Sequence, residues 1–190
     1  MPENTFMAGF GKANISHTES VPLQGFGNGF FRRSTEVEVD LYSVCLAVCD
    51  GDGNTAVIIS VDSGSIDDEV CGMVRDGIEE KTGVPAKNIL VTSIHQHATP
   101  NFWLDGVDAT DRYREFFVKA TVQAGVDAIN DLAPAEMHTA TVKTEGLTFV
   151  KHYIMNDGSY PADITRFAPS SGEEFRDEFL KMLNTQRNAQ

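Results

Sequence analysis

Two apolar runs joined by a short turn constrain the fold of this chain more than any other feature. Leu41 to Val48 and Thr55 to Val61 are rich in apolar and β-branched residues, and Asp50-Gly-Asp-Gly-Asn54 separates them. Aspartate, glycine and asparagine favour a tight turn, so the two runs are predicted to form a β-hairpin. Because both runs are almost continuously apolar, we expect burial on both faces, as in the middle of a layered α/β structure.

A helix is predicted after the hairpin. Ser65 is expected to cap its first turn, because a serine hydroxyl can accept hydrogen bonds from the free backbone N–H groups there. Gly83, in a left-handed conformation, and Pro85 are expected to end it. Its apolar residues recur at helical spacing and are expected to face a sheet: Val70, Met73, Val74 and Ile78.

The remaining segments complete the predicted fold. Further strands are expected over residues 6–15, 89–94, 136–143 and 147–154, and a second long helix over residues 110–132. This order predicts an α/β fold, a layered mixed β-sheet flanked by helices. Residues 1–160 are expected to form this domain. Residues 161–190 are expected to form a tail with a short amphipathic helix that carries Phe175, Phe179 and Leu183.

Charge and composition limit the partners of the chain. Acidic residues outnumber basic ones 28 to 15, and the formal net charge is −13. Such a charge repels phosphate backbones and favours solubility, so no nucleic-acid partner is expected, although Arg32 and Arg33 form one basic pair expected to be exposed. Without an apolar run of about 20 residues or a secretory signal, the chain is expected to be cytoplasmic and to lack a transmembrane segment. Buried, reduced thiols are expected for Cys45, Cys49 and Cys71.

Two histidines, His95 and His97, follow the strand predicted over residues 89–94. If the extended conformation continues, both lie on one face, at the strand end where α/β folds gather their ligands. Asp62 follows the neighbouring apolar run, and the three side chains can converge if the two strands are adjacent and parallel. Spacing alone leaves a zinc site and a purely hydrogen-bonding role both open. Asp62 can serve as a ligand, as the partner that fixes a histidine tautomer, or as a loop cap.

A glycine-rich loop is a second candidate for the site. The segment VPLQGFGNGF, residues 21–30, places Gly25 and Gly27 on either side of an aromatic residue. Such a loop can lie close to a ligand, or it can form a turn beside a sheet edge. It lacks the phosphate-binding glycine motifs. The other histidines, His17, His138 and His152, are expected to be structural or exposed.

Several segments, taken together and in order, resemble the N-terminal part of the neutral/alkaline (non-lysosomal) ceramidase family. They are GFGKANIS, VPLQGFGN, RRSTEVEVDLYSVCLAV, VIISVDSGSIDDEV, NILVTSIHQHATPN and TVQAGVDAINDLAPAEM. The resemblance runs from about residue 7 to residue 158. It implies part of an α/β catalytic domain that hydrolyses an amide bond, in an N-acyl lipid or a related small molecule, with the help of zinc.

The resemblance also implies roles for single residues. His95 matches a zinc-ligand histidine of the family and His97 the second histidine of the same motif, while Asp62, Gly25 and Gly27 are expected to line or support the site. The chain departs from the family motif at Gln96, Ala98 and Thr99.

The family's other zinc ligands and its catalytic serine match positions beyond residue 190, so we expect zinc to be weakly bound or absent in this chain alone. The alternative is a non-catalytic α/β domain that keeps the scaffold and binds a ligand or a partner. An unfinished sheet is expected to leave an open edge, through which the chain can form a homo-oligomer. A His-x-His motif also opens the metal site of amidohydrolase barrels. There it follows the first strand, whereas here at least three predicted strands precede it.

Overall fold

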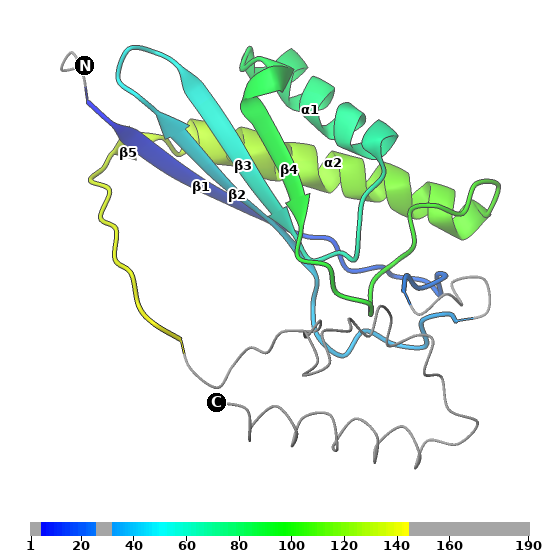
Figure 1. Ribbon diagram of the computed structural model, residues 1–190. Coiled ribbons are helices and arrows are strands. Elements are labelled where there is room, and N and C mark those ends of the chain that lie inside the picture. Colours follow the sequence, from blue (N-terminus) through cyan, green and yellow to red (C-terminus); the bar gives the residue numbers. More distant parts are fainter. Residues whose placement is uncertain (1–4, 26–31, 145–190) are drawn as a thin grey trace, which may run out of the picture. The chain divides into compact units, whose positions relative to one another are not determined.

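The predicted hairpin, helix and strand form the centre of the fold. In a computed structural model, which describes residues 5–25 and 32–144, they belong to a five-stranded sheet of order β4-β3-β2-β1-β5 (Figure 1). The elements are β1 (Met7–Asn14), β2 (Tyr42–Cys49), β3 (Thr55–Val61), α1 (Asp68–Thr82), the short 3-10 helix η1 (Ala86–Asn88), β4 (Ile89–Ser93), α2 (Asp108–Asn130) and β5 (Ala133–Pro134). All of them lie in the first of two compact units, Met1–His138 and Thr139–Gln190.

The mixed character of the sheet follows from its connections. Strands β2 and β3 pair antiparallel, and Asp50 closes their turn by accepting hydrogen bonds from the backbone N–H groups of Asp52 (2.9 Å) and Asn54 (3.1 Å). Helix α1 then crosses the sheet, so that β4 pairs parallel with β3. The predicted hairpin and the predicted α/β class are both confirmed.

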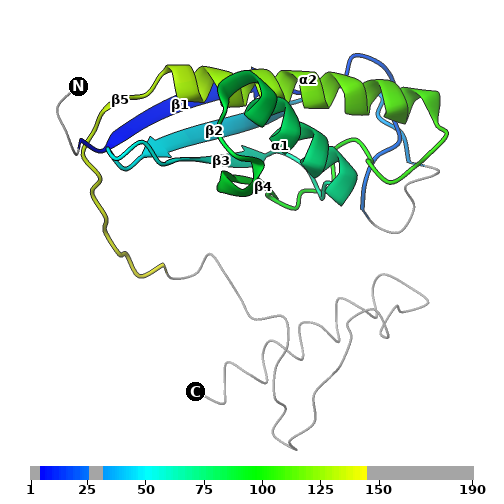
Figure 2. The same ribbon diagram turned by 90° about the horizontal axis from the view of Figure 1, so that it is seen from above.

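Both helices cover the same face of the sheet (Figure 2). Residues Cys45, Ala47, Val57, Ile59 and Val61 alternate along β2 and β3, and they are buried on this face against the helices. Burial raises the pKa of Cys45 to about 12. All three cysteines are free and buried, as predicted.

Glycines allow α2 to lie directly on β1. A side-chain carbon added to Gly11 would lie 2.0 Å from the backbone oxygen of Ala124, and one on Gly9 would lie 2.2 Å from that of Ala128. These distances are too short for any side chain, so the helix can approach the strand this closely only at glycine.

The opposite face of the sheet is not covered by any described helix or strand. Val44 and Ile58 alternate with the buried residues of β2 and β3, and they are 45% and 43% exposed. The expected burial on both faces is therefore wrong for the part of the chain that the structure describes. The reason is that α1 and α2 pack side by side on one face.

The ends of α1 correct one prediction and confirm another. The helix is capped by Asp67, whose side-chain oxygen accepts a hydrogen bond from the N–H of Val70 at 2.8 Å, and not by Ser65. Met73 does not face the sheet, because it lies on the outer side of the helix and is 48% exposed. Gly83 ends the helix in the predicted left-handed conformation, with φ 76°.

The strand predicted over residues 136–143 is not formed. Only Ala133 and Pro134 pair with β1, and residues 136–144 are exposed and without regular structure. Alternating side chains do not make a strand unless a neighbouring strand offers free hydrogen-bonding groups, and this segment has no such neighbour among the described residues. The predicted strand 147–154, the tail helix and the domain boundary at residue 160 lie outside the described residues.

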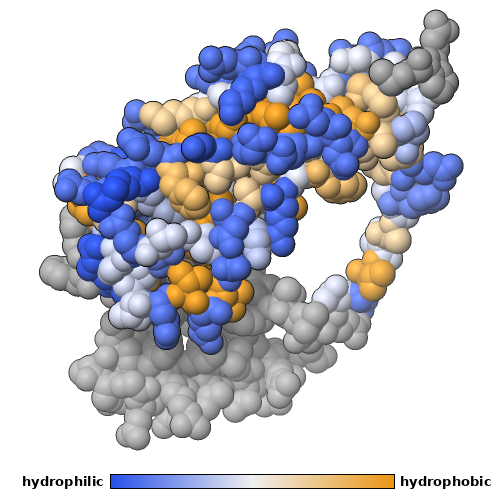
Figure 3. Space-filling view, turned by 180° about the vertical axis from the view of Figure 1, so that it is seen from behind, coloured by the Kyte–Doolittle hydropathy of each residue, from blue (hydrophilic) through white to orange (hydrophobic). Residues whose placement is uncertain are grey.

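Polar and charged side chains cover most of the helix-bearing side, with smaller apolar patches between them (Figure 3). In the described ranges, neither helix is apolar over a length that could span a bilayer.

Candidate functional site

The loops that follow β3 and β4 lie together because parallel strands end at the same edge of a sheet. The serine loop (residues 63–65) follows β3, and the histidine loop (residues 94–99) follows β4. The backbone N–H groups of His95 and Gln96 both donate to the carbonyl oxygen of Ser63, at 2.9 and 3.3 Å. The two loops are therefore held as one unit.

His95 leaves the strand geometry. Its φ is 62°, in the left-handed region, and it is the only residue other than glycine with a positive φ in the described ranges. We predicted that the extended conformation continues through both histidines, and this prediction is wrong at His95. The exposed ring turns back toward the serine loop, where its Nδ1 lies 2.8 Å from the carbonyl oxygen of Gly64.

This contact determines the tautomer of His95. A carbonyl oxygen can only accept a hydrogen bond, so Nδ1 must carry the proton. In the neutral ring, Nε2 then has a free lone pair. A histidine that binds a metal through Nε2 is held in the same way, with Nδ1–H donated to a carbonyl or a carboxylate.

His97 lies beside His95. The two ring centroids are 5.1 Å apart and the rings are inclined by 72°. Two imidazoles that share one tetrahedral zinc ion have centroids about 5 Å apart, so this separation is compatible with a common ligand. Gly25 packs against His97: its φ is 92°, and a side-chain carbon added there would lie 2.4 Å from the ring.

Asp62 does not join the histidines. Its carboxylate accepts a hydrogen bond from the backbone N–H of Tyr42 at 2.9 Å, which extends the pairing of β2 with β3. The strands are adjacent and parallel as expected, but Val61 pairs with Ser93. Asp62 is thus level with Ile94, whereas His95 leaves the strand geometry and its ring turns toward Gly64. The expected convergence of the three side chains is not found.

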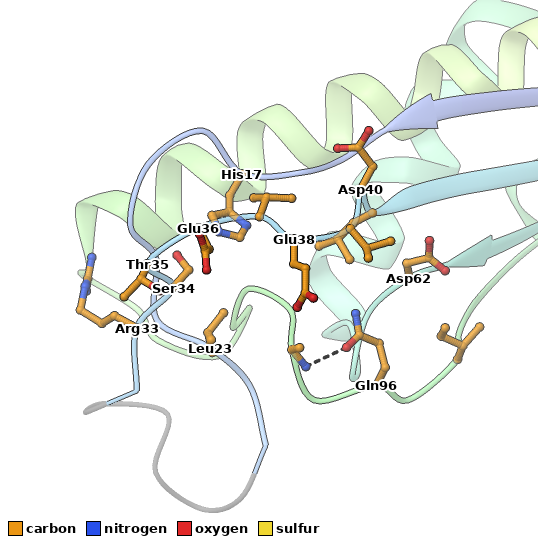
Figure 4. Close-up of a pocket in the computed structure, with 15 residues that line it drawn as sticks. His17, Leu23, Arg33, Ser34, Thr35, Glu36, Glu38, Asp40, Asp62 and Gln96 are labelled. Carbon is orange, nitrogen blue, oxygen red and sulfur yellow. Dashed lines mark hydrogen bonds between the residues drawn. The ribbon is translucent and has the colours of Figure 1, made fainter.

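Asp62 instead borders a cavity of about 550 Å³ (Figure 4). Alternate residues of the histidine loop, Ile94, Gln96 and Ala98, line this cavity, whereas neither histidine does. The rest of the lining is largely acidic and apolar and includes Leu23, Glu36, Val37, Glu38, Val39 and Asp40. The loop therefore separates the cavity from the histidine pair.

His17 also lines this cavity. Both of its ring nitrogens are buried without a hydrogen-bond partner among the described residues, and burial lowers its pKa. It is half-buried, whereas His138 is exposed, 3.4 Å from the carboxylate of Glu136. His152 and Gly27 lie outside the described residues.

A buried polar network supports the two loops, and no sequence pattern predicted it. Gln24 is 8% exposed, and its side chain binds Ser65 at both ends. Arg32 donates to the backbone carbonyls of Gln24 and His97. The expected exposed basic pair is therefore wrong for Arg32, while Arg33 is exposed and donates to the carbonyl of Ser20. Long-range side-chain to backbone contacts of this kind have no local pattern.

The two imidazoles fit a zinc site as donors but do not complete one. In residues 5–25 and 32–144, no group of three or more His, Cys, Asp or Glu side chains could hold a metal ion. A catalytic zinc ion needs about three protein ligands.

Comparison with solved structures finds the same fold in ceramidases. A neutral ceramidase from Pseudomonas aeruginosa matches with a TM-score of 0.62 and 19% identity over 70% of this chain. A ceramidase complexed with C2 matches with a TM-score of 0.61 and 18% identity over 70% of this chain. The chain spans 22% of the length of each. No protein-family model and no curated protein sequence matches the chain.

Proposed function

We propose that this chain carries the first part of the metal site of a ceramidase-like, zinc-dependent hydrolase that cleaves an amide bond in an N-acyl lipid or a related small molecule. The observation that carries the proposal is the contact of His95 Nδ1 with the carbonyl of Gly64, which leaves Nε2 free to bind a metal. The fold shared with ceramidases supports it.

The described residues have separate tasks in this proposal. His95 and His97 hold the ion, the carbonyl of Gly64 orients the first ring, and Gly25 leaves space for the second. Zinc, when bound, polarises a substrate carbonyl and makes bound water more acidic. The remaining ligands come from outside the described residues, as the resemblance to ceramidases implies.

A second candidate is a non-catalytic domain that binds a ligand or a partner. It is favoured by the cavity of about 550 Å³, which lies apart from both histidines. A pocket of this size can hold a small molecule without any metal.

Zinc titration of the purified chain separates the two candidates. We expect weak, substoichiometric binding, reduced about tenfold or more by His95→Ala and also reduced by His97→Ala. His138→Ala is the matched control, because this ring is exposed and its neighbour is only Glu136. The chain alone is not expected to hydrolyse an N-acyl lipid amide, because its described residues supply fewer than the three ligands that a catalytic zinc ion needs. Zinc binding that survives both His95→Ala and His97→Ala would contradict the proposal and favour the second candidate.

A further inference from the structure

We infer that Gln24 is a positioning residue that sets the tautomer and the orientation of His95 through the peptide group between Gly64 and Ser65. The inference takes its functional meaning from the proposed metal site. The contacts themselves do not depend on a metal.

The argument begins with one planar peptide group. The carbonyl of Gly64 and the N–H of Ser65 belong to the same peptide, so they are rigidly coupled and point in opposite directions. His95 Nδ1 contacts the carbonyl at 2.8 Å, and the side-chain oxygen of Gln24 accepts from the N–H at 2.6 Å. Rotation of this peptide would break both contacts together. Gln24 therefore fixes the direction in which the carbonyl meets the imidazole.

The other end of the Gln24 side chain adds a second restraint. Its Nε2 donates to Ser65 Oγ at 2.6 Å and lies 3.2 Å from the carbonyl oxygen of Ser65. Trp103 Nε1 donates to the same hydroxyl at 3.1 Å. Ser65 is therefore held on both its backbone and its side chain, and this explains why it does not cap α1.

Gln24 is itself held in place. Its backbone N–H donates to the carbonyl of Thr99 at 2.9 Å, and Thr99 Oγ1 accepts from the N–H of Gly64 at 3.1 Å. A side-chain carbon added to Gly64 would lie 2.1 Å from the Gln24 side-chain oxygen, so glycine is required for this approach. Gln24 thus connects the serine loop with the histidine loop.

Loss of the Gln24 amide should release the peptide. The carbonyl of Gly64 could then turn away, and Nδ1 of His95 would lose its acceptor. An imidazole without this partner is free to carry its proton on Nε2, where it can no longer bind a metal through that nitrogen.

The test uses two substitutions at position 24 in the full chain. Gln24→Met keeps the length of the side chain but removes its hydrogen bonds, whereas Gln24→Glu keeps an acceptor for the N–H of Ser65. The matched control is Gln123→Met, because Gln123 lies on α2 and binds Asp127 at 2.8 Å. The tautomer of His95 is read from the ¹⁵N chemical shifts of its ring, and circular dichroism confirms that each variant is folded.

We expect Nδ1–H in the wild type, in Gln24→Glu and in Gln123→Met, and a shift toward Nε2–H in Gln24→Met. Zinc affinity of Gln24→Met should fall by about 10- to 100-fold. A folded Gln24→Met variant that keeps the wild-type tautomer overturns the inference. If Gln24→Met does not fold, the wild type still decides: an Nε2–H tautomer, or a Ser65 amide that exchanges with solvent without protection, overturns it.

The outcomes also separate this inference from the proposed function. If the tautomer of His95 depends on Gln24 but zinc binds neither the wild type nor the variants, Gln24 is a positioning residue and the proposed zinc site is wrong. If zinc binds through His95 and the tautomer is independent of Gln24, the proposed zinc site stands and Gln24 is not a positioning residue.

Discussion

Single histidines in this molecule differ sharply in their surroundings, and His17 has the clearest consequence for pH. Burial lowers its pKa below the usual value of 6.5. At a pH between the lowered value and 6.5, the unfolded chain therefore binds more protons at this position than the folded protein does. Protonation then favours the unfolded state, and the free energy of unfolding falls as the pH falls.

We predict that urea denaturation will show this loss as the pH is lowered from about 7.5 to values below 6.5, with most of the loss below 6.5. The variant His17→Gln should lose part of this pH dependence, because glutamine does not titrate. His138→Gln should keep it, since His138 is exposed. Identical pH profiles for the wild type and His17→Gln would show that the buried ring does not carry the effect.

The histidine pair illustrates what local sequence cannot supply at the residue scale. His95 and His97 follow the end of a strand as predicted, but their rings come together through the left-handed conformation of His95 and not through the extended conformation on which the spacing argument depended. The left-handed conformation of His95 could not be predicted from residue type, because only a few per cent of residues other than glycine adopt it, even though histidine is among the enriched ones. The position of Asp62 depends on the register of β3 with β4, which a single sequence does not fix.

At the scale of elements, the contact of β1 with α2 depends on glycine. Gly11→Ala would place a carbon 2.0 Å from the backbone oxygen of Ala124 and 2.8 Å from the nitrogen of Ala128. Helix backbone cannot rotate away as a side chain can, so α2 would have to move off the sheet. We predict a loss of about 3 kcal/mol in the free energy of unfolding, measured by urea denaturation.

Gly72→Ala is the matched control for Gly11→Ala. Gly72 lies within α1, and a side-chain carbon there would meet nothing within 4 Å. Alanine has the higher helix propensity, so this variant should be more stable by about 0.5 to 1 kcal/mol. Equal effects of the two substitutions would show that the close approach of α2 to β1 does not matter for stability.

The elements that were predicted correctly carry their own local signals. The hairpin is marked by the turn after Cys49, and the end of α1 is marked by Gly83. The start of α1 was misplaced because two residues near it, Ser65 and Asp67, are both good caps, and the choice between them depends on Gln24 and Trp103. These partners are about 40 positions away in the chain.

At the scale of the whole sheet, an apolar row crosses the face that no described helix covers. Strand register places Phe10, Leu46, Ile58 and Leu90 side by side on four neighbouring strands. Phe10, Ile58 and Leu90 are exposed, and Phe10 is 65% exposed. Surfaces of this kind, and the unpaired backbone of an edge strand, favour association. Strand β4 has only β3 as a neighbour among the described residues.

These features motivate the expectation of a homo-oligomer, and we predict that the chains meet through the edge of β4. We predict that sedimentation will show association that increases with concentration. Thr92→Lys should weaken it, because Thr92 is exposed on the edge strand and a lysine there opposes the pairing of a second strand. Met73→Lys on the outer side of α1 adds the same charge to an exposed position and should not change association.

Ile58→Lys distinguishes association through the edge strand from association through the face of the sheet, since Ile58 lies away from the edge within the apolar row. If Ile58→Lys abolishes association and Thr92→Lys does not, the chains meet through the face of the sheet, and a monomer at every concentration would contradict both arrangements.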